Sequence, residues 1–430
     1  MTRPARLHDR YPELGRGPLP VAPYVDPAYF ALEKRHIFKR CWLQVGRVEE
    51  LPKVGDYMVR DIAVCDASII VARDRQKNIR AFHNVCSHRL NRVATEPAGN
   101  TRKFFCKFHG WAYDLDGSLS GVPDEGSFME LDKSCLGLTP VSVDTWNGFI
   151  FINLDPAPSM SLAEFLDPMF GGLKDYPFHR FTACYSWNTI VNCNWKVAID
   201  AFQETYHVAY VHGRSIADAL AKDAQGNQHP IDGLCGDFHR RLSIAGNRQS
   251  VYGNPGAATG APAESSVAGS QKTGRLIAAK ALAVGAGGAK EDLSDVKLPD
   301  LLNWTRHPDW AFDINVIFPD FYLSCRPNYF QAYNFRPVSH NRTSFEARVY
   351  YPEMRTAGGR FYQEYMRVAL RDVLLEDLGT LEMTQSAAET GAKSEMIIQD
   401  FEIMVRHQAV VVERLIQEGL RRDGQAQAAE

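Results

Sequence analysis

The chain has 430 residues, of which 45% are hydrophobic and 23% are charged, and its formal net charge is -3. These values are ordinary for globular proteins, so charge gives no reason to expect nucleic acid or an anionic membrane surface as a partner. A chain of this length exceeds the size at which a single hydrophobic core usually divides, so at least two domains are expected.

Targeting and cysteine patterns point to the cytoplasm. The first twenty residues carry two early arginines but no apolar segment with a small-residue cleavage site, and no later run approaches the roughly 18 apolar residues of a membrane span. The nine cysteines are scattered and do not resemble the disulfide framework of a small secreted domain. We therefore expect a cytoplasmic protein whose cysteines bind metal or are buried thiols.

The first half of the chain predicts an all-β domain. Residues 1–40 form an N-terminal segment in which Asp26-Pro27 precedes a helical pattern. Within residues 41–165, short runs rich in valine, isoleucine and aromatics predict strands, and Asp116-Gly117 predicts a hairpin turn. These strand runs lie at 57–65, 67–74, 78–86 and 146–156. A short amphipathic helix and linker follow, so we place a domain boundary between residues 160 and 180.

The second domain, residues 180–430, predicts an α+β fold. Residues 181–212 pass from strand alternation to a helical segment, and residues 308–352 return to strands before a long helical C-terminus. The segment 253–295 is dominated by glycine, alanine and serine. Such a segment is a candidate mobile loop or lid, and a tolerated surface insertion is the alternative.

A first metal-binding pattern combines two cysteines and two histidines. Cys86 and His88 flank one serine, and Cys106 and His109 follow after seventeen intervening residues. This ligand set suits either tetrahedral zinc or a Rieske iron–sulfur cluster. Zinc ligands are usually separated by two to four residues, so the single-residue gap after Cys86 favours the cluster.

A second pattern lies about 100 residues later, where His207 and His212 occur with Glu204 and Asp200. Two histidines and a carboxylate suit a facial triad for ferrous iron, although ordinary hydrogen-bonded histidines are the alternative. Positions 207 and 212 differ by about 140° on a regular helix. Shared ligation therefore predicts a break or π-bulge near residues 208–211.

The cysteine and histidine pattern resembles the Rieske motif of ring-hydroxylating oxygenases. Arg89 follows the first histidine, and Gly110-Trp111 follows the second, as in that family. The chain departs from the family at Leu90, where glycine is usual, and at Lys107-Phe108, where a Pro-Tyr pair is usual. No cysteine follows His88 or Cys106 at short range, which disfavours a respiratory-complex Rieske subunit.

The second pattern resembles the oxygenase motif of the same family. Asn194-Trp195-Lys196 precedes Glu-Thr-Tyr-His at 204–207 and then His212. The resemblance implies a Rieske [2Fe-2S] cluster held by Cys86, His88, Cys106 and His109. It also implies a mononuclear Fe(II) held by His207, His212 and a downstream carboxylate.

The downstream carboxylate is best matched by Asp377, on a predicted C-terminal helix where apolar residues 374, 375, 378 and 381 form an inward stripe. Glu376 and Glu382 are the other candidates for this ligand. The alternative is that Asp377 is an ordinary solvent-exposed acid of the helix. In the family, the carboxylate three residues before the first histidine ligand relays electrons across a subunit boundary. Glu204 occupies that position, which is commonly aspartate.

As a whole, the resemblance implies an α+β protein, with an all-β Rieske domain followed by a helix-grip catalytic domain of antiparallel sheet and long helices. It implies a terminal oxygenase that uses O2, and electrons from NAD(P)H passed through a reductase and sometimes a ferredoxin. Mono- or dioxygenation or oxidative demethylation of a hydrophobic, aromatic small molecule would follow. A homotrimer is expected, with or without a β-subunit.

Two other functions remain open at this point. A Rieske electron carrier would not need the second iron motif, and a zinc-stabilised binding protein would be colourless. Substrate identity is not readable from the sequence. A hydrophobic site is expected from six apolar residues near the ligand segments or on the strands facing them. These are Phe202, Val208, Val211, Phe312, Val316 and Phe330.

Overall fold

The computed structural model describes residues 6–429 except 214, 217–218, 224–225 and 248–297. The predicted loop 253–295 therefore lies outside the described residues. The chain divides into two compact units, Ala31–Asp167 and Met1–Phe30 with Pro168–Glu430. The domain limits expected at residues 40, 165 and 180 stay predictions.

The unit Ala31–Asp167 is built from three small antiparallel sheets, which confirms the all-β prediction. Their strand orders are β5-β4-β3-β6, β10-β11-β2 and β7-β8-β9. The strands are β2 (Leu43–Arg47), β3 (Asp56–Ile62), β4 (Ala67–Arg73), β5 (Ile79–His83), β6 (Ala98–Asn100), β7 (Phe104–Phe105), β8 (Ala112–Tyr113), β9 (Leu119–Gly121), β10 (Ser142–Trp146) and β11 (Phe149–Asn153). The short helices are η2 (Lys34–Phe38), η3 (Val48–Glu50), η4 (Ala63–Cys65), η5 (Glu125–Ser127), η6 (Lys133–Cys135) and α4 (Leu162–Leu166).

The hairpin turn predicted at Asp116-Gly117 joins β8 to β9. The Asp114 N–H donates to the Ser118 carbonyl at 2.9 Å, which closes the turn. Gly117 has a φ of 88°, and a Cβ there would lie only 2.4 Å from Cε1 of Phe82. Both the left-handed backbone and the close approach of the aromatic ring therefore require glycine at this position.

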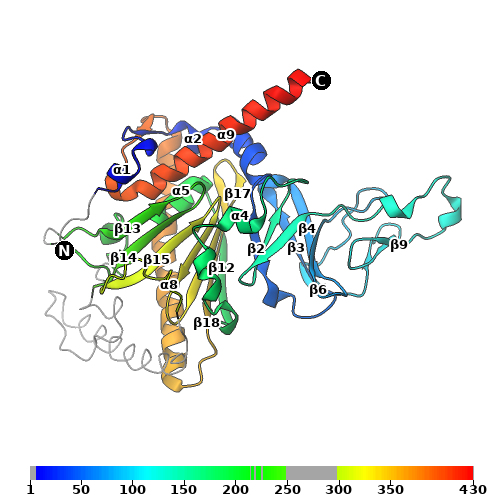
Figure 1. The fold of residues 1–430 in the computed structure, drawn as a ribbon, viewed down its shortest axis with the longest axis horizontal. Helices are drawn as coiled ribbons and strands as arrows, with labels where there is room; N and C mark the ends of the chain where they lie inside the picture. The colour runs from blue at the N-terminus through cyan, green and yellow to red at the C-terminus, as the bar shows by residue number, and fades with distance from the viewer. Residues whose placement is uncertain (1–5, 214, 217–218, 224–225, 248–297, 430) are drawn as a thin grey trace. The chain divides into compact units, whose positions relative to one another are not determined.

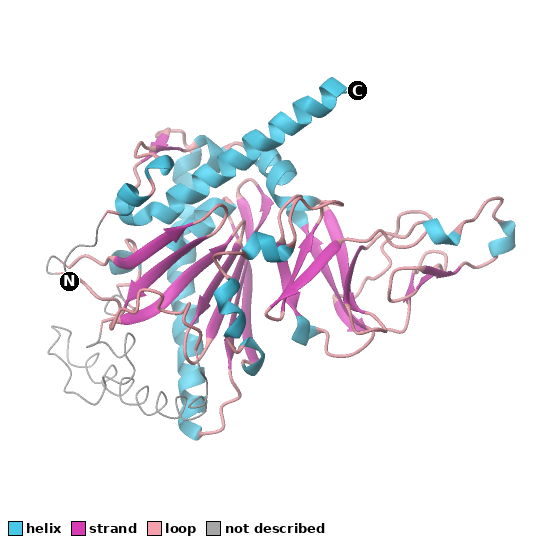
Figure 2. Ribbon diagram, viewed as in Figure 1, coloured by secondary structure: helices cyan, strands magenta, loops and turns pink. Residues whose placement is uncertain are grey.

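The other unit contains a seven-stranded antiparallel sheet in the order β12-β18-β17-β16-β15-β14-β13. Its strands are β12 (Ala183–Val191), β13 (Pro230–Cys235), β14 (Arg240–Ala245), β15 (Trp310–Ile317), β16 (Phe321–Cys325), β17 (Phe330–Ser339) and β18 (Arg342–Tyr351). A separate pair joins β1 (Leu19–Pro20) to β19 (Glu395–Met396). Figures 1 and 2 show the long helix α8 (Ala357–Glu389) running along one face of the large sheet.

The helices that position the site pack on this sheet. Helix α5 (Trp195–Asp200) contacts β17, β18 and α8, and α9 (Ile403–Ala429) contacts β13 and β14. The remaining helices are α1 (Leu7–Arg10), η1 (Pro12–Leu14), α2 (Ala22–Val25), α3 (Pro27–Glu33), η7 (Gly171–Asp175), η8 (Phe178–Arg180), η9 (Ala201–Gln203), α6 (Val208–Val211) and η11 (Asp400–Glu402). The predicted sheet with long helices is thereby confirmed. Among the described helices, none is long and apolar enough to cross a membrane.

Candidate metal centres

Cys86 and Cys106 begin two loops that share one backbone hydrogen-bond pattern. In each loop the cysteine N–H donates to the carbonyl five residues later, at 2.9 and 2.8 Å respectively. The N–H four residues later donates back to the cysteine carbonyl, at 3.1 and 2.9 Å. The two loops therefore share a backbone path, and both cysteines are buried. The histidine follows its cysteine by two residues in the first loop and by three in the second.

The two histidines of these loops lie side by side. The ring centroids of His88 and His109 are 4.5 Å apart, and His88 stacks on Trp111 with an interplanar angle of 7°. The Nδ1 atom of His88 is buried and has no hydrogen-bond partner in the described part of the chain. A buried nitrogen without a partner is costly, so a metal ligand role fits this atom.

The two thiols have different electrostatic surroundings. Burial raises the pKa of Cys86. Burial alone would also raise the pKa of Cys106, but hydrogen bonds from the Phe108 and His109 N–H groups and from Cys86 outweigh it and lower that pKa. Backbone N–H groups aimed at sulfur stabilise thiolate, which is the form that binds metal. The four side chains together fit either a Rieske cluster or zinc.

Tyr113 supports the first of these thiols. Its hydroxyl lies 3.2 Å from Sγ of Cys86 and accepts a hydrogen bond from the Ser87 N–H at 3.0 Å. Burial raises the pKa of Tyr113, so the phenol keeps its proton. Since the Ser87 N–H occupies the acceptor side of the hydroxyl, that proton is available to the sulfur.

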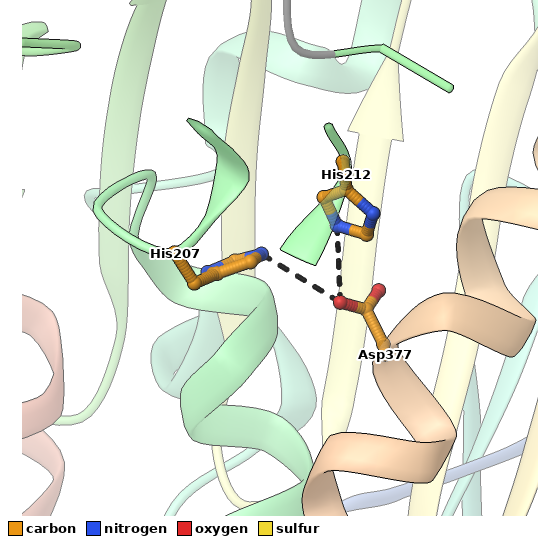
Figure 3. A group of neighbouring side chains, drawn as sticks. All are labelled: His207, His212 and Asp377. Carbon is orange, nitrogen blue, oxygen red and sulfur yellow. Dashed lines mark ion pairs between the residues drawn. The ribbon is translucent and has the colours of Figure 1, made fainter. Parts of the chain in front are cut away.

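His207, His212 and Asp377 form the second cluster, although they come from distant parts of the sequence (Figure 3). One ligand atom from each lies within 4.8 Å of the others. Oδ1 of Asp377 is 3.6 Å from Nε2 of His207 and 3.0 Å from Nε2 of His212. Two imidazoles and a carboxylate in this arrangement could hold a divalent iron.

The backbone irregularity near the two histidines is not where the sequence predicted it. Val208–Val211 form a regular turn, α6, with His207 at its N-cap and His212 at its C-cap. The expected irregularity within residues 208–211 was therefore wrong. The helical path is interrupted earlier, at Glu204, which is extended with φ -147° and ψ 171°.

The side chain of Glu204 explains this interruption. Its Oε2 accepts hydrogen bonds from the Tyr206 N–H and, at 3.2 Å, from the His207 N–H. A carboxylate that captures the free N–H groups at a helix start stabilises a new turn there. The sequence contained this acid, but its capping role was not anticipated.

Each imidazole is held at Nδ1 by a glutamate. Oε1 of Glu204 hydrogen-bonds Nδ1 of His207, and Oε2 of Glu376 lies 2.8 Å from Nδ1 of His212. The Ser215 hydroxyl donates to the same Glu376 oxygen at 2.6 Å. Carboxylates placed in this way fix the tautomer and the ring orientation of metal-binding histidines. Burial lowers the pKa of His212, but Asp377 and Glu376 outweigh burial and raise it.

The acids of α8 therefore separate into distinct roles. Asp377 is brought to the Nε2 atoms, whereas Glu376 holds the far side of His212. Glu382, the other rival, accepts hydrogen bonds from the backbone and side chain of Asn192 at 2.9 and 3.0 Å.

The inward stripe predicted beside these acids is partly wrong. Leu375 is 58% exposed, whereas Leu374 and Leu381 are buried. Position 375 lies about 100° further round the helix than position 374, so it turns away from the sheet.

Asp200, the other acid of this motif, lies away from the two imidazoles. It is partly buried and accepts hydrogen bonds from the Tyr24 hydroxyl at 2.9 Å, from Gln203 at 2.6 Å and from Gln408 at 3.1 Å. Burial raises the pKa of Asp200 to about 7. These contacts tie the end of α5 to the N-terminal segment and to α9.

A cavity of about 150 Å³ lies beside the second cluster, and His207, His212 and Asp377 form part of its wall. The apolar wall includes Phe202, Val208, Ile216, Phe312, Ile314 and Leu370. Three residues predicted from the sequence thus line it. The other three are not in the wall. Val316 and Phe330 are fully buried in the sheet, and Val211 is partly buried.

The polar part of this wall was not predicted from the sequence. Arg326 contributes a cation, and Gln331 with three tyrosines, at 322, 329 and 333, contributes further polar atoms. Residues two apart on a strand share a face, so an arginine at the end of the strand after Tyr322 and Ser324 could have been assigned to the same side.

These loops and clusters identify the class of the protein. Residues 41–141 match the Rieske [2Fe-2S] domain, and residues 178–418 match the ring hydroxylating alpha subunit catalytic domain. The chain belongs to the alpha subunits of ring-hydroxylating Rieske oxygenases. The family cofactors are a Rieske cluster and a mononuclear iron, which favours the cluster over zinc for the cysteine and histidine loops.

Several relatives are similar to parts of the chain. The glycine betaine monooxygenase oxygenase subunit of Chromohalobacter salexigens is 37% identical over 206 residues, 48% of this chain and 45% of the relative. The carnitine monooxygenase oxygenase subunit of Escherichia coli K12 is 32% identical over 197 residues, which cover 45% of this chain and 52% of the relative. Benzene 1,2-dioxygenase subunit alpha of Pseudomonas putida is 30% identical over 270 residues, which cover 56% of this chain and 58% of the relative. The chain thus spans about half the length of the curated relatives it matches.

Solved structures extend the likeness of fold to nearly the whole chain. A quaternary ammonium Rieske monooxygenase involved in carnitine oxidation matches with a TM-score of 0.66 at 19% identity, over 93% of this chain and 94% of its own. Naphthalene 1,2-dioxygenase from Rhodococcus sp. matches with a TM-score of 0.67 at 22% identity, over 95% of this chain and 96% of its own. At these identities the matches establish a shared fold.

Proposed function

We propose that this chain is the terminal oxygenase component of a Rieske oxygenase system. It uses O2 and electrons passed from NAD(P)H through a reductase, with or without a ferredoxin, to hydroxylate or oxidatively demethylate a small molecule. The observation that carries the proposal is the convergence of His207, His212 and Asp377 on the wall of a cavity. The Rieske loops of a neighbouring copy of this chain would supply the electrons.

The residues have separate roles in this proposal. Cys86 and Cys106 would hold one iron of the cluster, and His88 and His109 the other, as in Rieske centres. His207, His212 and Asp377 would hold the mononuclear iron. A ferrous ion bound by such a triad has positions open for dioxygen beside the substrate.

Glu204 has two roles in the proposal. It holds Nδ1 of His207, so the imidazole presents Nε2 toward Asp377. We also assign to it the relay of electrons across a subunit boundary, following its position in the family motif. The relay requires neighbouring subunits, so we propose a head-to-tail homotrimer, with or without a β-subunit.

Two substrate types fit this proposal. The walls of the cavity are mainly aliphatic and aromatic, as expected for a hydrophobic, aromatic molecule. The names of two relatives specify glycine betaine and carnitine, which are quaternary ammonium compounds. Aromatic walls suit both types, because aromatic rings also bind quaternary ammonium groups.

Metal analysis tests the proposal. Iron, acid-labile sulfide and zinc are measured per chain in anaerobically purified protein, together with magnetic resonance after reduction. The proteins compared are wild type, His207→Ala and, as control, His179→Ala, which changes an exposed histidine outside both centres. We expect about three irons and two sulfides in wild type. His207→Ala should lose about one iron and keep the Rieske signal, and the control should lose none.

Other results would contradict the proposal. Two irons per chain, with no iron lost in His207→Ala, would indicate an electron carrier. Zinc without sulfide would indicate a zinc-stabilised binding protein.

A further inference from the structure

Arg326 places a cation in the wall of the cavity beside the histidine cluster. Arg326 directly follows β16 and shares the cavity wall with Tyr322 of that strand. Its guanidinium carbon lies 4.0 Å from the ring centroid of Phe312 and 5.2 Å from that of Tyr329. The flat face of the guanidinium is therefore covered by aromatic rings.

Stacking of this kind uses the faces of the guanidinium and leaves its edge N–H donors unused. Nε of Arg326 is buried and has no hydrogen-bond partner among the residues that the structure describes. Arg241 on strand β14, which β15 separates from β16, differs in this respect, because its Nε donates to Asn315 at 2.6 Å.

The acids among the described residues of the cavity wall are engaged elsewhere. Glu204 holds Nδ1 of His207, and Asp377 lies against the Nε2 atoms of His207 and His212. A buried cationic donor without an acceptor is strongly unfavourable, whereas a carboxylate can accept two parallel N–H bonds from one guanidinium. The missing acceptor is therefore expected on a ligand in the cavity.

We infer that Arg326 binds a carboxylate of the substrate, so that the substrate is a small carboxylic acid. This inference rests on the proposed function and narrows its substrate class. The apolar body of the acid would lie against the aromatic and aliphatic walls. The cavity of about 150 Å³ matches the size of an engineered cavity that binds benzene, so the body is expected to be about one ring in size.

Binding measurements with matched pairs test the inference. Isothermal titration of the holoprotein compares benzoate with benzamide, and glycine betaine with choline, so that each pair differs mainly in the carboxylate. Wild type should bind the carboxylate of at least one pair about tenfold to hundredfold more tightly than its partner. Arg326→Gln should reduce this preference to within about twofold. Arg326→Lys should keep part of the preference, because lysine retains a single positive charge.

The control variant is Arg371→Gln, which removes an exposed arginine of α8 that pairs with Asp372. It should leave the preference unchanged. The inference is overturned if wild type binds no carboxylate at millimolar concentration, if it binds benzamide and choline at least as tightly, or if Arg326→Gln keeps the preference.

Iron, sulfide and the Rieske signal are measured on the same preparations. Full metal content without a carboxylate preference would refute the inference alone. A preference that depends on Arg326 in protein lacking iron and sulfide would refute the proposed function alone. Metal content equal to wild type also shows that the Arg326 variants are folded.

Discussion

Glu376 and His212 form a 2.8 Å hydrogen bond between Oε2 and Nδ1, on the side of the imidazole away from Asp377. We predict that Glu376→Gln weakens Fe(II) binding at the mononuclear site, because the amide is a poorer acceptor and no longer increases the basicity of Nε2. Loss of such a supporting carboxylate typically costs about 10- to 100-fold in metal affinity. Competition with a calibrated chelator measures the change, with the Rieske signal as an internal reference.

The matched control for this prediction is Glu382→Gln, six residues further along α8, where the carboxylate accepts a hydrogen bond from Asn192. It should keep the wild-type affinity. Equal iron affinity in Glu376→Gln and wild type would show that the hydrogen bond does not support the metal.

The Tyr113 hydroxyl should raise the reduction potential of the cluster. It lies 3.2 Å from Sγ of Cys86, and a donor to sulfur stabilises the reduced state. Removing a hydrogen bond worth about 1 kcal/mol corresponds to about 40 mV for one electron, so Tyr113→Phe should lower the potential by about that amount. Redox titration followed by magnetic resonance measures it. An unchanged potential would mean that the hydroxyl proton does not point to the sulfur.

Leu90 should be a strained position. Its φ is 61°, and the side chain is 76% exposed, whereas Gly110 has φ 73° at the equivalent place in the other loop. We predict that Leu90→Gly raises the stability of the Rieske unit by about 1 kcal/mol, since relief of left-handed strain exceeds the added entropy of the unfolded glycine. The temperature at which the visible absorption of the cluster is lost reports the change.

The variant Leu90→Ala separates backbone strain from loss of the exposed side chain. It retains the Cβ, so it should remain near wild type. Equal stabilisation by alanine and glycine would locate the effect in the leucine side chain instead.

The buried carboxyl of Asp200 should make stability depend on pH. Burial raises its pKa to about 7 in the folded state, against about 3.9 when unfolded. Between these values the folded state holds a proton that the unfolded state has released, so this contribution to stability falls as pH rises from about 4 to about 7. Asp200→Asn should remove that fall. Urea unfolding from pH 5 to pH 8 tests this.

In this experiment the free energy of unfolding of Asp200→Asn, relative to wild type, should increase steadily with pH up to about 7 and then level off. The control is Asp372→Asn, which changes an exposed acid of α8 and should keep the wild-type slope. Parallel curves for Asp200→Asn and wild type would show that Asp200 is already ionised at pH 5.

The sequence was informative where chemistry depends on short spacing. Cys86 and His88 are two residues apart, so their loop had to be local, and the hairpin at Asp116-Gly117 followed from turn chemistry. The short loop at Cys86 and the hairpin turn were both predicted correctly. The break before His207 was misplaced, because it depends on which N–H groups the Glu204 carboxylate captures, and residue spacing alone does not specify such contacts.

Long-range contacts set the limits of prediction at the site. Glu376 and Asp377 are adjacent on one helix, and only the packing of α8 determines which of them reaches the Nε2 atoms. Arg326 was missed for a related reason. Its stacking on Phe312 joins two strands, and a single arginine in a sequence is usually a solvated surface residue.

The contact between His212 and α8 spans 164 residues of sequence. An ion bound there would act as a reversible cross-link, since it would close a long loop whose ends are free to separate in the unfolded chain. Chelation of this ion should therefore lower the resistance of the catalytic unit to proteolysis, while the cluster loops, which belong to the other compact unit, keep theirs. Iron supply would in this way set the lifetime of the protein as well as its activity.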